Sequence, residues 1–352
     1  SWARIPAEPP PGGIVLVVDE AHFAQNIHAV RSQALLRLAR HPRIRAVWLL
    51  TGTPLKNGRP IQLLPLLMAI GHPLARDRRA YETLFCNGHW RQAGGRQVWD
   101  CQGASRLDEL QRLLRPQLLH RRKRDCLDLP PKQRHFHVVS LAAAAQHHFD
   151  AALQRQLSRY RSRVAAGLVR SDAERLALLT AMRQLGAQHK LPALTVLLQR
   201  LRAAGEAVVV FSSFRAPLLQ LQRFEGGELL TGLVAPPQRQ ERLERFQSGG
   251  SDLLLATYGV AGLGLGLQRA AHVILLERPW TPGDAEQAED RCHRLGTERT
   301  VSCHWLQLGG ADDLVDGLIL SKVDRIDVVL GRRRRQLRRQ SLVRMLDELV
   351  QP

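Results

Sequence analysis

The sequence predicts an α/β protein with two regions of parallel sheet, joined by a mostly helical insertion. Two apolar, β-branched runs near the start, Ile14–Val18 and Arg45–Leu50, are typical of strands buried on both faces. Strand and helix patterns alternate again from residue 191, which favours a second parallel sheet with helices on both faces. Between these regions, over residues 61–190, apolar residues recur at helical spacing.

The first region begins after a segment rich in Pro and Gly at residues 6–13, which breaks regular structure. The strand 14–18 ends in acidic residues, and residues 34–40 have a helical pattern. The second strand, 45–50, is followed by a sequence in which Gly and Pro enforce a turn. These elements predict one βαβ unit.

The middle region is predicted to be mainly helical. Ser105 and Asp108 have the spacing of a helix start. Long helices are expected at 142–166 and 172–188, with a short extended piece at 135–140.

The last region alternates between the two kinds of element. We expect strands at 207–211, 229–231, 252–257, 273–276 and 300–306. We expect helices at 191–204, 217–223, 237–247, 283–294 and 314–330. The predicted parts of the chain are therefore 1–70, 71–190, 191–330 and a basic tail, 331–352. The arginine run 332–339 fits a solvated tail and a phosphate-binding segment equally well.

Charge points to a polyanionic partner, of which nucleic acid is the common one. The 352 residues carry a net charge of +19. The five cysteines form no CxxC pair, which argues against a zinc knuckle or a disulfide framework and favours a reducing cytoplasm. No apolar run reaches membrane-spanning length, so no membrane partner is expected.

An acidic pair follows the first strand. In open α/β sheets ligands bind at the carboxyl ends of strands. There Asp19 is suited to holding Mg²⁺ through water, because this ion prefers oxygen ligands and keeps part of its water shell. Glu20 is placed to orient or deprotonate an attacking water.

The string Asp19-Glu20-Ala21-His22 and the later Thr51-Gly52-Thr53-Pro54 together resemble motifs II and III of superfamily-two helicase-like ATPases. The continuation Leu55-Lys56-Asn57-Gly58 narrows the resemblance to the Swi/Snf family. In that family these segments bind the nucleotide and couple its state to the nucleic acid. The resemblance thus implies a nucleotide-binding role for His22 and a coupling role for Thr51, Gly52 and Thr53.

The second region resembles the same family independently. Residues 287–296 resemble motif VI, 256–267 resemble motif V, and 208–214 resemble motif IV. Arginines three apart on a helix share one face, and their planar forks suit phosphate oxygens. The resemblance implies arginine fingers at Arg291 and Arg294. It also implies nucleotide contacts at Gln287, Gly262 and Gly264, and nucleic-acid or coupling contacts at Ser212 and Thr257.

The resemblance covers residues 15–330 and implies two RecA-like lobes, the first incomplete, that bind ATP and Mg²⁺ between them. The implied activity is an ATP-driven motor that moves on double-stranded DNA, with a DNA-bound protein complex as a further candidate partner. Two positions depart from the usual residues, Thr297 in motif VI and Gly266 in motif V.

No phosphate-binding loop of the form GxxxxGK[ST] occurs in the chain, and only 18 residues precede Asp19. We therefore expect a chain truncated before that loop and inactive as an ATPase by itself. Two alternatives stay open: a non-catalytic DNA-binding remnant, and a conventional strand-separating helicase.

Overall fold

The computed structural model describes residues 8–93, 95–121, 123–166, 172–261, 265–309 and 311–331. They fall into two compact units. Unit 1 contains the residues up to His120 and the segment that starts at Leu320, and unit 2 contains Arg121–Ile319. The predicted basic tail from residue 332 lies outside the described residues.

Unit 1 is built on a parallel pair of strands, β1 (Ile14–Val18) and β2 (Ile44–Leu49). The 3-10 helix η2 (Ala21–Ala24) and helix α1 (Val30–Ala39) connect them and pack in one apolar cluster with Leu16 and with the last residues of both strands, Val18 and Leu49. The other face is open, since Val15, Val17 and Trp48 are 47%, 52% and 60% exposed. The prediction that these strands are buried on both faces is therefore wrong for this structure.

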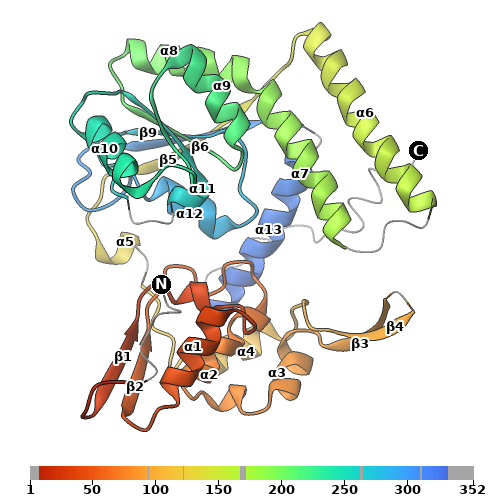
Figure 1. The fold of residues 1–352 in the computed structure, drawn as a ribbon, viewed down its shortest axis with the longest axis vertical. Coiled ribbons are helices and arrows are strands. Elements are labelled where there is room, and N and C mark those ends of the chain that lie inside the picture. The colour runs from red at the N-terminus through yellow and green to blue at the C-terminus, as the bar shows by residue number, and fades with distance from the viewer. Residues whose placement is uncertain are drawn as a thin grey trace. The chain divides into compact units, whose positions relative to one another are not determined.

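Short helices and a hairpin complete unit 1 (Figure 1). A second cluster joins α2 (Leu64–Ala69), α3 (Arg78–Phe85), α4 (Leu107–Leu114) and the end of α13 (Ala311–Val329). The 3-10 turn η3 (Pro60–Gln62) precedes α2, and η4 (Pro73–Ala75) lies between α2 and α3 in sequence. Strands β3 (His89–Ala93) and β4 (Arg96–Asp100) form an antiparallel hairpin. The sequence prediction missed this hairpin, although a Gly-Gly pair between two runs is a known hairpin signal.

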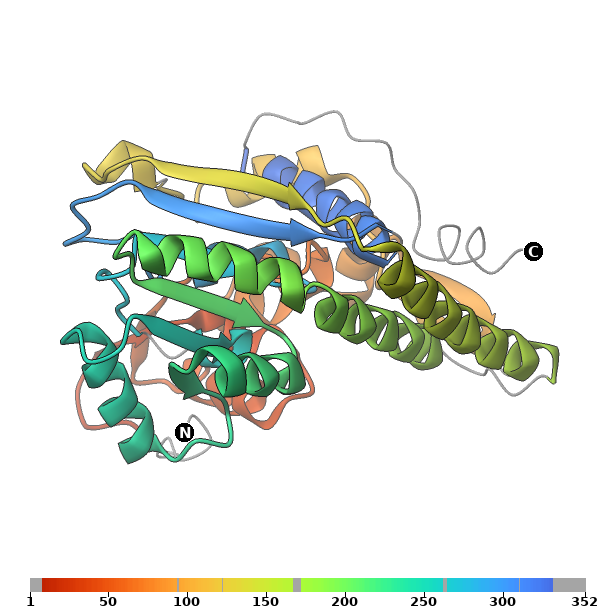
Figure 2. The ribbon, with the colours of Figure 1, turned by 90° about the horizontal axis from the view of Figure 1, so that it is seen from above.

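Unit 2 contains a six-stranded sheet in the order β5-β10-β9-β6-β8-β7, and every pair in it is parallel. The α/β class with parallel sheet is therefore confirmed. The strands are β5 (Lys132–Val138), β6 (Val208–Ser212), β7 (Glu228–Leu230), β8 (Leu253–Thr257), β9 (His272–Leu275) and β10 (Val301–Gln307). Figure 2 shows β5 and β10 side by side at one edge.

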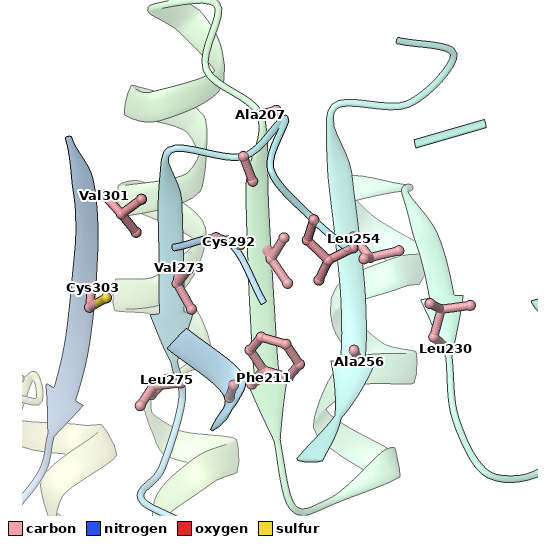
Figure 3. Packing of buried hydrophobic residues seen from close by; sticks show 14 of the residues in the cluster. Ala207, Phe211, Leu230, Leu254, Ala256, Val273, Leu275, Cys292, Val301 and Cys303 are labelled. Atoms are coloured by element: carbon pink, nitrogen blue, oxygen red, sulfur yellow. The ribbon is translucent and has the colours of Figure 1, made fainter. Parts of the chain in front are cut away.

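Helices cover both faces of this sheet because side chains alternate along each strand. Val209, Phe211, Leu254 and Val273 point to one face, where the cluster of Figure 3 lies. That cluster includes residues of α10 (Pro236–Gln247) and α12 (Pro282–Glu289). The opposite cluster includes α8 (Leu191–Ala203) and α9 (Arg215–Glu225). Short helices α5 (Lys123–Cys126) and α11 (Tyr258–Ala261) precede β5 and follow β8.

The predicted long helices are present as α6 (Ala143–Ala165) and α7 (Asp172–His189), which run side by side (Figures 1 and 2). The extended piece expected at 135–140 is β5, a full strand of the main sheet. The two compact units therefore have other boundaries than the predicted parts 1–70, 71–190 and 191–330. The predicted ranges describe the modules of the family that the sequence resembles, and they stay a prediction. None of the helices in the described part of the chain is long and apolar enough to cross a membrane.

Three imidazoles form a hydrogen-bonded row across the edge of the sheet, which we call the histidine row: His137, His304 and His272. His304 Nδ1 lies 2.9 Å from His137 Nε2, and its Nε2 lies 3.0 Å from His272 Nδ1. Burial, and then the neighbouring His272, His137 and His135, lower the pKa of His304 to about 3. The row therefore resists protonation in the folded unit.

Candidate functional site

The predicted acidic pair lies where β1 ends. Asp19 is exposed, and its Oδ1 accepts the backbone N–H of Glu20 at 2.8 Å. Glu20 adopts a left-handed conformation with φ 50° and ψ 45°, which is unfavourable for a residue with a Cβ. The next residue, Ala21, donates its N–H to the carbonyl of Leu50 at 2.9 Å. Local strain of this kind gathers at functional sites, so the geometry agrees with a functional role for this turn.

His22 connects the acidic turn to the turn after β2. The buried ring brings Nδ1 to 3.1 Å from Glu20 Oε2 and 3.2 Å from Thr51 Oγ1. A neutral Nδ1 is either a donor or an acceptor. In one tautomer Nδ1 carries the proton and donates a hydrogen bond to the Glu20 carboxylate. In the other tautomer Nδ1 is unprotonated and accepts a hydrogen bond from the Thr51 hydroxyl. His22 thus ties the two predicted motifs together through one atom.

The turn at Thr51–Thr53 is held by its own side chains and by one residue that the sequence prediction missed. Thr51 Oγ1 accepts the N–H of Thr53 at 3.1 Å. The buried Gln25 donates from Nε2 to the carbonyls of Thr53, at 3.1 Å, and Pro54, at 2.7 Å. Gly52 is exposed. In the sequence, the one indication for Gln25 is that it stands three residues after His22, at the end of the same short 3-10 helix.

Asp19 fits the predicted Mg²⁺ ligand by the chemistry of its donor atoms. Its carboxylate is exposed at the carboxyl end of a parallel strand, and carboxylate oxygens that bind through water suit this ion. The 352 residues carry no GxxxxGK[ST], the loop that cradles phosphates in ATP sites of this type.

In unit 2, the predicted arginine fingers follow α12 but are not part of it. The helix ends at Glu289, and residues 290–296 form successive turns. The predicted helix 283–294 is therefore present up to Glu289, but the prediction that it continues to residue 294, with Arg291 and Arg294 on one helical face, is wrong. The chain turns because Glu289 and Cys292 are both fully buried and non-local contacts hold the loop, including Leu267 N–H to the Arg291 carbonyl at 2.8 Å. Gln287 is half-buried within α12.

Thr297, one of the departures from the family pattern, stabilises the same loop. Its Oγ1 donates to the Cys292 carbonyl at 2.7 Å and lies 3.2 Å from the backbone N–H of Arg294. Arg294 Nη1 lies 3.4 Å from the carbonyl of Leu265. Threonine at this position thus fixes the backbone around Arg294.

Basic side chains from α5 and from the edge strand β5 hold the start of this arginine loop. The carboxylate of the fully buried Glu289 accepts two hydrogen bonds of 2.8 Å from Arg134, and Lys132 Nζ lies 3.0 Å from its Oε2. Lys123 and Lys132 lie 2.9 Å and 3.1 Å from the carboxylate of Asp290. Burial opposes the charged form of Lys132, but Glu289 and Asp290 outweigh it and its pKa is raised. We call Lys123, Lys132, Arg134, Glu289 and Asp290 the acidic clamp.

The other predicted residues of unit 2 lie at strand ends. Ser212 is buried at the end of β6, and its hydroxyl donates to Glu277 Oε2 at 2.9 Å. Burial raises the pKa of Glu277, and the nearby guanidinium of Arg183 partly offsets this. Thr257 is the half-buried last residue of β8. Gly262 and Gly264 lie outside the described residues.

The structure thus gathers the predicted residues into two sets. Asp19, Glu20, His22 and the turn at residues 51–53 share one hydrogen-bonded site in unit 1. The arginine loop and the strand ends belong to unit 2. The approach of the carboxylates to the guanidiniums across a nucleotide stays a prediction.

Comparisons with known proteins find two family models on the chain. The model described as SNF2-related domain matches residues 13–193, and the helicase conserved C-terminal domain matches residues 189–296. A mouse protein, DNA annealing helicase and endonuclease ZRANB3, is 32% identical over 335 residues, which cover 90% of this chain and 30% of that protein.

A second relative is the SWI/SNF-related matrix-associated actin-dependent regulator of chromatin subfamily A-like protein 1 of Xenopus tropicalis. It is 29% identical over 318 residues, which cover 88% of this chain and 32% of that protein. This chain therefore spans about a third or less of the curated relatives it matches. The solved SWI2/SNF2 ATPase core of Sulfolobus solfataricus in complex with dsDNA has a TM-score of 0.44 and 19% identity, covering 94% of this chain and 72% of that one.

Proposed function

This chain belongs to the family of SNF2-related helicase-like proteins, and from that premise we propose that its residues serve an ATP-driven motor that moves along double-stranded DNA. The observation that carries the proposal is the single nitrogen of His22, which contacts both Glu20 of the acidic turn and Thr51 of the next turn. A motor must transmit the state of its nucleotide to a neighbouring element, and this contact joins two such elements.

In this proposal each charged side chain has a separate task. Bound Mg²⁺ would neutralise charge on the phosphates of ATP. Asp19 holds that ion through water, and Glu20 accepts a proton from the attacking water. Arg291 and Arg294 stabilise negative charge that develops on the transferred phosphoryl group. The acidic clamp and Thr297 position the loop that carries these arginines.

His22 transmits a change at Glu20 to Thr51. When Glu20 gains a proton, its carboxyl group no longer attracts the proton on His22 Nδ1. The tautomer in which Nδ1 accepts a hydrogen bond from the Thr51 hydroxyl is then favoured. Gln25 holds the carbonyls that follow Thr51, so a shift of this hydroxyl reaches the turn at Thr53 and Pro54.

Double-stranded DNA is the proposed partner. The net charge of +19 favours contacts to phosphates, which tolerate any sequence and weaken as salt is added. The family's motors generally shift or strip bound proteins without separating strands, and the TGTPLKN string and the long helical segment favour that mode here. A DNA-bound protein complex is the proposed cargo.

A non-catalytic, DNA-binding role is a second candidate for this chain by itself. No GxxxxGK[ST] occurs in its 352 residues, and without that loop the phosphates lack their main binding site. We propose that the 352-residue chain binds duplex DNA but does not hydrolyse ATP.

The test is an ATPase measurement with and without duplex DNA, on the 352-residue chain and on any longer product of the same gene. We expect DNA-stimulated turnover only where a phosphate-binding loop is present. There Glu20→Gln and Arg291→Ala should each lower it at least about a hundredfold. Arg200→Gln, at an exposed arginine of α8, is the matched control and should leave turnover unchanged.

Stimulated turnover that survives Glu20→Gln or Arg291→Ala would refute the residue roles. Strand separation of a plain duplex in an unwinding assay would favour a conventional helicase instead. Turnover by the 352-residue chain itself would refute its assignment as a DNA-binding module.

A further inference from the structure

The hairpin β3–β4 of unit 1 is largely exposed to solvent. In Figure 1 it projects beyond α3, away from the helices of its unit. Residues 89–92 and 95–98 are all exposed, so both faces of the hairpin meet solvent. An isolated two-stranded hairpin is marginally stable in water. This hairpin therefore needs a strong anchor at its base.

Trp99 is that anchor. Its Nε1 donates to Glu82 Oε2 at 2.8 Å, and the Arg79 guanidinium carbon lies 3.2 Å from the centre of its ring. The buried Glu82 is in turn fixed by Arg78 at 2.6 Å. A Cβ on Gly88 would lie only 2.5 Å from the Trp99 ring. The chain thus packs closely around Trp99, whose contacts with Glu82 and Arg79 attach the base of the hairpin to α3.

Trp90 lies opposite Trp99 in the register but has a different environment. It meets Trp99 edge to face at a centroid distance of 5.5 Å, with Arg79 at 5.1 Å from its ring, and 57% of it is exposed. Its neighbours therefore orient the indole without covering it. A large aromatic ring that is held in place and open to solvent is the feature on which nucleic-acid bases stack.

The surrounding charge favours a polyanion. Residues 76–100 contain five arginines and three acidic residues. The carboxylates are engaged locally: Asp77 accepts the N–H of Ala80, Glu82 binds Arg78 and Trp99, and Asp100 pairs with Arg91 at 3.0 Å. Arg96 is exposed on the neighbouring strand. Arginine next to an open aromatic ring matches a base with its phosphate.

A protein strand added to the edge of the hairpin is the main alternative occupant. Charged side chains on an edge strand oppose such pairing, and here Arg91 lies on β3 and Arg96 on β4, one on each edge. The same arginines attract phosphates. Single-stranded rather than duplex DNA fits the open ring, because in a duplex the base faces are already covered by their neighbours.

We propose that the β3–β4 hairpin, together with Arg79, is a binding site for single-stranded DNA in which a base stacks on Trp90 and the arginines contact adjacent phosphates. The site is separate from the residues of the proposed motor and does not require ATP turnover. It gives the chain a contact for an unpaired stretch beside the duplex.

The test measures affinity by fluorescence anisotropy for a labelled oligothymidylate of about 15 nucleotides, within the range of single-strand site sizes, and for a duplex. Trp90→Ala in the 352-residue chain should weaken single-strand binding at least about fivefold, whereas Trp90→Phe should stay within about twofold. Duplex affinity should not change. Phe224→Ala, at a 76% exposed aromatic of α9, is the matched control and should leave both affinities unchanged.

A second measurement does not depend on the stability of the Trp90 variant. Arg96→Gln should lower the salt dependence of single-strand binding by about 0.7 in the slope of log affinity against log salt. Photocrosslinking of an iodouracil oligonucleotide to the unaltered chain should label the peptide that contains Trp90. Crosslinks confined to other peptides, or equal losses of single-strand binding in Trp90→Ala and Phe224→Ala, would overturn the proposal. An equal loss of duplex binding in Trp90→Ala would also overturn it.

Discussion

Glu289→Gln is the substitution that tests most directly how unit 2 positions its arginine loop. The carboxylate of Glu289 is fully buried and holds Lys132 at 3.0 Å and Arg134 through two bonds of 2.8 Å. It also accepts the indole N–H of Trp305 at 2.9 Å. Glutamine keeps the size of the side chain and an acceptor oxygen for Trp305, but it removes the charge that both cations face.

The size of the expected loss of stability depends on the two positive charges, those of Lys132 and Arg134, that Glu289→Gln leaves without their carboxylate. Breaking a buried ion pair by removing one partner costs about 3–5 kcal/mol. The side chains of Lys132 and Arg134 keep 22% and 37% exposure, and Lys132 keeps its contact with Asp290, so part of this cost is relieved by water. We therefore expect a loss of about 2–3 kcal/mol in the free energy of opening of β5 and β10.

Hydrogen exchange followed by mass spectrometry measures this free energy for peptides of β5 and β10, separately from unit 1. Glu298→Gln, at an exposed carboxylate of the same unit, should change it by less than about 0.5 kcal/mol. Arg134→Met should cost less in the Glu289→Gln background than in the unaltered chain, because both substitutions break the same contact. Opening free energies of the Glu289→Gln peptides equal to those of Glu298→Gln would refute the clamp as a stabilising element.

Three further predictions concern other parts of the chain. The histidine row should make unit 2 less stable in acid: the folded pKa of His304 is about 3, below the unfolded value, so its contribution is full above about pH 6.5 and declines as pH falls from there towards 3. Urea midpoints at neutral and mildly acidic pH check this, and His304→Gln should show a smaller decline; an equal decline would contradict the assignment. Gly88→Ala should destabilise the base of the hairpin by about 1–3 kcal/mol through its clash with Trp99, whereas Gly186→Ala, in a helix with open space around it, should stabilise by up to about 1 kcal/mol, both measured by hydrogen exchange. Gln25→Ala should speed exchange in the peptide that contains the turn at residues 51–58, since a buried side chain with two hydrogen bonds is lost, while exposed Gln97→Ala should not; unchanged exchange would mean that the turn holds itself.

The sequence by itself determined the parts that depend on local pattern. Alternating strands and helices from residue 191 predicted strands β6 to β10 of the unit 2 sheet closely, because period and turn chemistry are local properties. The DEAH and TGTP strings were each predicted to follow a strand directly, and both do. The contact of His22 with Thr51 follows from this, since parallel strands bring their carboxyl ends together.

The tertiary structure alone determined those features in which contacts between residues distant in sequence override the local sequence pattern. Helix α12 ends at Glu289 rather than at residue 294 because Lys132 and Arg134, more than 150 residues earlier, bury and neutralise that carboxylate. The piece near residue 135 became a sheet strand because β10 offered it a free edge. Local sequence contains no record of such partners, so the end of that helix, the acidic clamp and the anchoring of the hairpin by Trp99 became visible only in the folded chain.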